Sequence, residues 1–202
     1  MFGRFAREDV RDRSVHALVE RYSVDKRQAK RVVRSCERLF EQTQEALGLS
    51  NEDNDLLRRT AYLHEIGLAI SHSGYHHHSA YLLEFSDIPG FSQVDQIRMS
   101  QLAHNHRRKL KTEMLEQVQD IGGRTLVYLC LLLRLAVLVH RSRNDHDKSD
   151  LQLHIIDEDH WQVIVDPEFE EYALLVFDLE DDIDQFKKWG VELTVITHST
   201  EQ

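Results

Sequence analysis

Apolar and polar positions follow two different patterns along this chain of 202 residues. Through about residue 143, apolar side chains recur at the three- and four-residue spacing of amphipathic helices, whereas residues 151–156 and 161–165 alternate as strands do. The spacing predicts helices over 9–22, 23–47, 51–70, 80–85, 92–105, 125–143 and 172–186, and a third strand over 191–196. The pattern therefore predicts a mainly α protein, with an all-helical domain over 1–145 and a small ββαβ domain over 146–202.

The predicted helix at 23–47, with Ser23 as its N-cap, has two distinct faces. Val32, Cys36 and Phe40 share an apolar face, which predicts contact with the core. The other face carries five cations, called here the basic ridge: Arg27, Lys30, Arg31, Arg34 and Arg38. Such a face is often only solvated. Because Glu37 is the only acid nearby, anion binding is kept as the alternative.

A second group of basic side chains lies at the end of the helix predicted over 92–105. This basic run comprises His104, His106, Arg107, Arg108, Lys109 and Lys111. Cations near a helix C-terminus interact favourably with the helix dipole, so part of the run is explained as capping. Six cationic or protonatable groups within eight residues exceed that need, and the run is also a candidate anion site.

Histidines gather in residues 62–81, YLHEIGLAISHSGYHHHSAY. His64 and Glu65 are adjacent at the end of a predicted helix, and a glycine-containing loop with further histidines follows. Because imidazole is a common metal ligand, the candidate metal residues are His64, Glu65, His72, His76 and His78. The alternative is that the loop histidines lie at the surface and that His64 is a hydrogen-bonded core residue.

Composition narrows the class of protein. The hydrophobic content of 41% and charged content of 30% are typical of a globular protein. Cys36 and Cys130 are the only cysteines, which excludes a disulfide framework and predicts a cytoplasmic location. The apolar run 126–140 is too short to span a membrane and contains Arg134, so a buried helix is expected there. The N-terminal residues do not resemble a signal peptide.

The net charge of −10 is distributed unevenly. Residues 144–202 have a net charge of −14, whereas residues 1–143 have a net charge of +4. This asymmetry predicts that the two parts have different partners, with any anionic ligand bound by the first.

Five segments in order resemble the C-terminal part of the exopolyphosphatase / guanosine pentaphosphate phosphatase (Ppx/GppA) family. They are DVRDRSVHALVERYSVDKRQAKRV, AYLHEIGL, SHSGYHHHSAYLLEFSDIPGFS, HRRKL and LLRLAVLVHRSR, and the resemblance covers about residues 3–196. It implies a helical bundle similar to that of HD metal phosphohydrolases, followed by a small α/β part. It also implies a catalytic half made of actin-like domains. No glycine-rich phosphate loop is seen in this chain, so we expect those domains to act in cis or in trans.

The HD resemblance also implies four ligand positions. His64 matches the histidine of the adjacent His-Asp pair, and Glu65 replaces the aspartate. The early histidine is expected near Gln28-Ala29, and the late aspartate at Val137. Because loss of ligands removes tight metal binding, a degenerate metal site is expected. No cofactor is expected for this chain, and Mg²⁺ or Mn²⁺ would belong to the full-length parent enzyme.

The leading hypothesis is a polyphosphate-binding and dimerisation region of an exopolyphosphatase-type enzyme, with the basic run and the basic ridge holding the phosphates. The alternatives are an active metal-dependent phosphohydrolase and a purely structural dimerisation module. A nucleic acid is disfavoured as partner because no aromatic residues interleave with the cations, and no membrane partner is expected. The choice between polyphosphate and guanosine pentaphosphate stays open, as does the choice between an excised region and a standalone protein.

Overall fold

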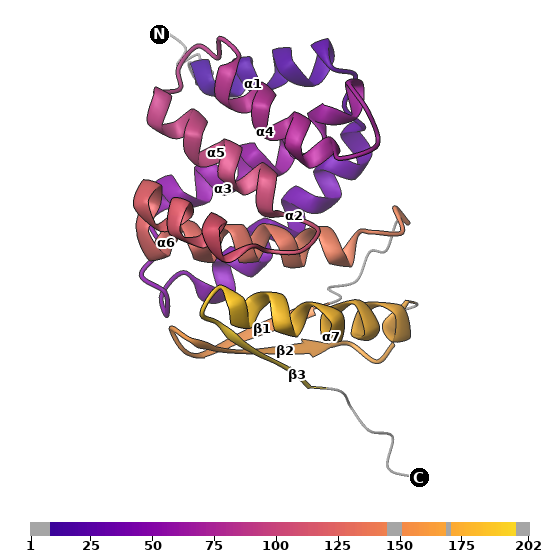
Figure 1. Cartoon of the computed structure of the whole chain (residues 1–202). Coiled ribbons are helices and arrows are strands. Elements are labelled where there is room, and N and C mark those ends of the chain that lie inside the picture. The colour runs from indigo at the N-terminus through magenta and orange to yellow at the C-terminus, as the bar shows by residue number, and fades with distance from the viewer. Residues whose placement is uncertain (1–8, 145–150, 169–170, 197–202) are drawn as a thin grey trace, which may run out of the picture.

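The computed structural model describes residues 9–144, 151–168 and 171–196 (Figure 1). In chain order the elements are α1 (Val10–Arg21), α2 (Lys26–Thr43), α3 (Asn51–Leu63), the 3-10 helix η1 (Ile66–Ala69), α4 (Tyr75–Phe85), α5 (Gln93–Asn105), α6 (Thr112–Val139), β1 (Leu151–Asp157), β2 (His160–Val165), α7 (Tyr172–Lys188) and β3 (Glu192–Ile196). The predicted fold class, mainly α with a small ββαβ part, is confirmed.

Helix α6 supplies the centre of the helical part. All residues from Leu126 to Ala136 are buried, and α2, α3 and α5 contact this helix. By length and composition alone α6 could cross a membrane. Its apolar side chains are instead covered by the other helices, which confirms the buried helix predicted for this run.

The start of α2 differs from the prediction because a stronger cap lies nearby. Helix α2 begins after Asp25, whose carboxylate accepts the backbone N–H groups of Arg27 and Gln28, and not after Ser23. Ser23 has a φ of 50°, outside the extended range of an N-cap. Helix α3 begins after Ser50, which forms a capping box with Asp53.

The histidines predicted to lie in a loop belong to helix α4. This helix begins at Tyr75, after Gly74 with a φ of 65°, so His76 and His78 lie in its first turn. Helix α3 ends at Leu63, and η1 brings Gly67 against the start of α4. A Cβ at Gly67 would lie 2.1 Å from the carbonyl oxygen of Tyr75, so only glycine permits this approach.

Helix α6 starts earlier than predicted and is interrupted. It begins at Thr112, and Gly123 (φ 63°, ψ −160°) breaks the helical geometry two residues before the predicted start at residue 125. Before Gly123, Val118 is the only buried residue of the helix, whereas the segment after it forms the core.

Strands β1 and β2 pair antiparallel, and β3 lies parallel to β2 at the other edge, in the order β1-β2-β3. Helix α7 lies between this sheet and the helical part (Figure 1). Trp161 of β2 packs against Phe186 of α7 with ring centroids 6.2 Å apart, and both side chains are fully buried. One cluster of buried apolar residues includes both parts of the chain. The division into domains at residue 145 stays a prediction, and residue 145 itself lies outside the described residues.

Candidate functional site: a cationic cavity

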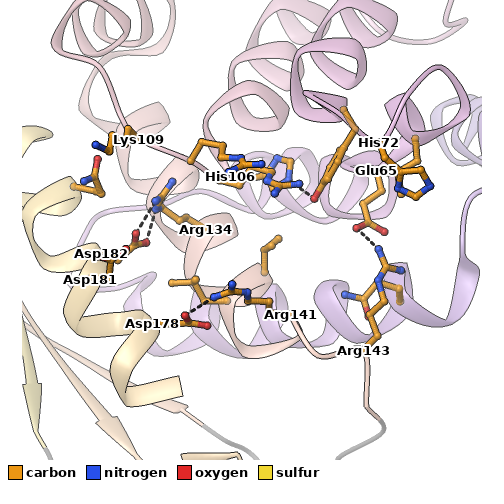
Figure 2. A pocket seen from close by; sticks show the side chains of 18 residues that line it. Glu65, His72, His106, Lys109, Arg134, Arg141, Arg143, Asp178, Asp181 and Asp182 are labelled. Atoms are coloured by element: carbon orange, nitrogen blue, oxygen red, sulfur yellow. Dashed lines mark hydrogen bonds and ion pairs between the residues drawn. The ribbon is translucent and has the colours of Figure 1, made fainter. Parts of the chain in front are cut away.

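A cavity of about 560 Å³ lies where the turn after α5, the end of α6 and helix α7 meet (Figure 2). Its charged lining residues are Glu65, Arg107, Arg108, Lys109, Arg134, Arg141, Arg143, Asp178, Asp181 and Asp182. Six are cations and four are acids, so the lining carries a net charge of +2 with histidine neutral. The lining of this cavity is therefore positively charged, although the whole chain has a net charge of −10.

One arginine of the cavity is fully engaged within the protein. Nε and one Nη of Arg134 bind the two carboxylate oxygens of Asp182, and the other Nη lies 3.5 Å from the carbonyl oxygen of Asn105. Both charged side chains are about 95% buried. Buried ions are expensive to desolvate unless they are paired. The pair therefore has a structural role, joining α6 to α7.

Two further arginines are held by acids but stay open to solvent. One Nη of Arg141 binds Asp178, while Arg143 binds Glu65 at 2.6 Å and Asp25 at 3.2 Å. The arginine side chains are 65% and 41% exposed, whereas Asp178 and Glu65 are only 8% and 7% exposed. The acids thus form the floor of the cavity, and the guanidinium groups extend from it.

The turn after α5 brings the most open positive charge. Arg108, with a φ of 67°, and Lys109 are exposed, and neither has an acidic partner within the described residues. The guanidinium of Arg107 stacks on the ring of Tyr75 at 4.5 Å. These three cations form one side of the cavity.

The wall behind Arg107 is a chain of buried polar groups. Nδ1–H of His106 donates to the carbonyl of Ala103, which leaves Nε2 to accept from the Tyr75 hydroxyl at 3.3 Å. His64 lies next to His106 and likewise donates from Nδ1 to Ala61. Burial lowers the pKa of His64 and holds that of His106 well below its ordinary value. Both rings are therefore neutral at pH 7, and His106 adds no positive charge.

Three of the four positions mapped from the HD resemblance line this cavity, and His64 does not. Gln28, Glu65 and Val137 all line it, although they come from different elements. The amide of Gln28 donates to the carbonyl of His140 at 2.8 Å, and Glu65 is taken by Arg143. The cavity thus presents guanidinium groups where that resemblance expects metal ligands.

The candidate metal residues are not brought together. His72 lines the cavity, whereas the rings of His76, His77 and His104 pack against one another between α4 and α5. Burial, with His77 as a further cause, lowers the pKa of His76 and of His104 to about 4. Within the described residues, no group of three or more histidine, cysteine or acidic residues is placed to hold a metal ion.

Only some of the predicted basic residues line the cavity. Of the basic run, Arg107, Arg108 and Lys109 line the cavity, and His104 and Lys111 do not. No residue of the basic ridge lines it. Two expectations of exposed charge need correction: His106 is 1% exposed, and Arg31 is 4% exposed and binds the side chain of Gln28.

Sequence reasoning missed the contribution of α6 and α7. Arg134, Arg141 and Arg143 were not predicted as site residues, and neither were Asp178, Asp181 and Asp182. A signal was present, because Arg134 is one charge within a long apolar run, and a buried charge requires a partner. The partner, Asp182, is 48 residues away in sequence, and nothing in the local pattern connects the two.

Comparison with known proteins agrees with the fold. Residues 10–183 match the model of the family described as Ppx/GppA phosphatase, domain III. The chain is similar to two proteins named guanosine-5'-triphosphate,3'-diphosphate pyrophosphatase. That of Aeromonas hydrophila is 37% identical over 132 residues, 65% of this chain and 27% of that protein. That of Pseudoalteromonas translucida is 30% identical over 195 residues, 93% of this chain and 38% of that protein.

The chain spans between about a quarter and two fifths of the length of these relatives. The family model, in contrast, matches most of the chain. The resemblance inferred from the five segments is confirmed: this chain belongs to the Ppx/GppA phosphatase family, of which it represents domain III.

Proposed function

We propose that this chain is a phosphate-chain-binding region of a Ppx/GppA phosphatase, and that the cationic cavity is the binding site. The observation that carries the proposal is the convergence of six cations on one concave surface, from the turn after α5, from α6 and from the residues that follow α6. Arginine and lysine are the side chains that hold phosphate groups, arginine through several N–H donors in one plane. The names of the relatives, which act on a guanosine phosphate, support a ligand of this class.

In this proposal the metal site of HD-type proteins is degenerate. Glu65, at the aspartate position of the His-Asp pair, binds Arg143. Val137, at the position of the late aspartate, has no ligand atom. Hydrolysis of the phosphate chain is assigned to actin-like domains acting in cis or in trans. The ligand is inorganic polyphosphate or the phosphates of guanosine pentaphosphate.

Titration of the purified chain with long polyphosphate at low and moderate salt tests the binding site. We expect binding that weakens as salt rises, because ion pairs with phosphates release bound counterions. The double variant Arg108→Ala/Lys109→Ala should weaken binding about tenfold or more, since two charge-assisted contacts are lost.

Lys30→Ala/Arg34→Ala is the matched control, because it removes the same charge from the exposed basic ridge. We expect it to change the affinity by less than about twofold. Equal losses in the two double variants would mean that the phosphate chain binds by overall charge and not in the cavity. Absence of binding at low salt would overturn the proposed function.

Self-association is a separate part of the proposal. Sedimentation velocity of the chain at several concentrations checks it. A monomer at all concentrations would remove this part, and the titration above would still decide the anion site.

A further inference from the structure

Acidic side chains in a phosphate-binding cavity present a physical problem. Asp178, Asp181 and Asp182 of α7 repel a phosphate chain, and yet they line the same cavity as the arginines. Asp182 is explained by its buried pair with Arg134. Asp178 and Asp181 lie one turn apart on α7, and their surroundings differ.

The partner of Asp178 is an arginine with unused donors. One Nη of Arg141 binds Asp178, and within the described residues Nε and the other Nη have no partner. Arg134, in contrast, uses Nε and both Nη groups inside the protein. Arg141 is therefore fixed at one end of its guanidinium and has the remaining N–H groups available to a ligand (Figure 2).

The burial of Asp178 and Arg141 indicates whether their ion pair remains when a ligand binds. The side chain of Asp178 is 8% exposed, whereas that of Arg141 is 65% exposed. A carboxylate so far from water loses much stability if its partner leaves. A phosphate is therefore expected to add to Arg141 and not to displace it from Asp178.

Fixing a long side chain before binding increases affinity. A free arginine side chain loses rotamer entropy when it is fully ordered. An arginine that is already held by a carboxylate loses less of it when the ligand arrives. Asp178 is thus useful to an anion site despite its charge.

Resting on the proposed function, we infer that Asp178 is a positioning residue for the phosphate chain, holding Arg141 so that its remaining donors face the phosphates. Arg143 is held in the same way by Asp25 and Glu65, with its Nε left over. Asp181 has no such role, because it is exposed and has no cationic partner among the described residues. The two aspartates therefore have opposite effects on binding.

The test compares two substitutions that remove the same charge from neighbouring turns of α7. Asp178→Asn should weaken the binding of long polyphosphate about two- to fivefold, the range for a partly exposed ion pair. Asp181→Asn should leave the affinity unchanged or raise it by up to about twofold, because it only removes a screened repulsion. Glu65→Gln is an independent second variant that should act in the same direction as Asp178→Asn.

A double-mutant cycle separates positioning from a general loss of structure. Asp178→Asn should have no further effect on binding when Arg141→Ala is present, because the residue acts through that arginine. Asp178→Glu should recover part of the affinity. Thermal unfolding checks that each variant is folded.

Binding by the unaltered chain, with Asp178→Asn equal to or tighter than Asp181→Asn, would overturn the inference alone. An additional loss from Asp178→Asn in the Arg141→Ala background would also overturn it. No binding by the unaltered chain would overturn the proposed function, so the two failures are distinguishable.

Discussion

The basic ridge on α2 and the cationic cavity contain similar side chains in different surroundings. On the ridge, Lys30 and Arg34 extend from one helix into solvent. In the cavity, arginines from α6 and from the turn after α5 converge, and three of them are held by acids. The ridge is easier to recognise in the sequence, whereas the N–H donors of three cavity arginines are held in place by acids. Under the proposed function, convergence and orientation of the cations matter more for anion binding than regular spacing of charge.

The largest expected difference between these regions concerns stability. Arg134→Met should lower the free energy of unfolding by about 3–5 kcal/mol, because it leaves Asp182 buried without a partner. Arg34→Ala on the ridge should change it by less than about 0.5 kcal/mol. Urea unfolding followed by circular dichroism measures both. The double variant Arg134→Met/Asp182→Leu should recover much of the loss, since no buried charge remains. Equal effects of Arg134→Met and Arg34→Ala would show that the pair of Arg134 and Asp182 is not desolvated.

A smaller loss is expected at the packing that supports the cavity wall. Gly67→Ala places a Cβ within 2.1 Å of the carbonyl oxygen of Tyr75, so α4 must shift. Overpacking of this kind costs about 1–3 kcal/mol. The same denaturant titration measures this loss, and polyphosphate affinity should fall as well because Tyr75 carries Arg107. If the stability were unchanged, α4 could shift without cost. The cavity wall that contains Tyr75 would then not be rigid.

A further expected difference is a dependence of stability on pH, which the ridge does not share. The pKa values of His76 and His104 are lowered to about 4 in the folded protein, whereas an unfolded histidine has a pKa of about 6.5. The unfolded chain therefore takes up protons first as the pH falls. The stability contributed by the two neutral rings is complete above pH 6.5 and is lost between about pH 6.5 and 4. The ridge contains no histidine.

Thermal unfolding at several pH values measures this dependence. His104→Gln should flatten the decline between pH 6.5 and 4. His154→Gln is the matched control, because His154 is exposed on β1. If the stability of the two variants depended on pH in the same way, the pH dependence would not come from the histidines that pack between α4 and α5.

Local patterns were sufficient for most of the fold. The apolar face of α2, helix α5 and the alternation of β1 and β2 all follow from spacing within a short window. The errors occurred where two local signals compete. Ser23 and Asp25 are both cap residues, and the carboxylate of Asp25 accepts two backbone N–H groups. The three consecutive histidines resemble a loop, but Gly74 precedes a helix in which His76 is buried beside Tyr75, whereas His77 is exposed.

The candidate site could be predicted only in part. Arg107, Arg108 and Lys109 were found because they are adjacent in sequence. The other half of the cavity depends on contacts between residues far apart, such as Arg134 with Asp182 and Arg143 with Glu65. The spacing of residues along the chain does not predict these pairs, because each pair depends on how α7 and the end of α6 pack on the helical part. The burial of His106 was missed for the same reason.

The interruption of α6 at Gly123 has a consequence for the motions of this region. Residues 112–122 are mostly exposed, whereas Leu126 to Ala136 are buried on all sides. Amide protons are protected from exchange with solvent in proportion to the cost of opening the structure around them. The two segments should therefore open independently, the first by local fluctuation and the second only when the whole domain unfolds. The arginine that joins α6 to α7 lies in the slowly exchanging segment, so the cavity is built on the part of the helix that opens last.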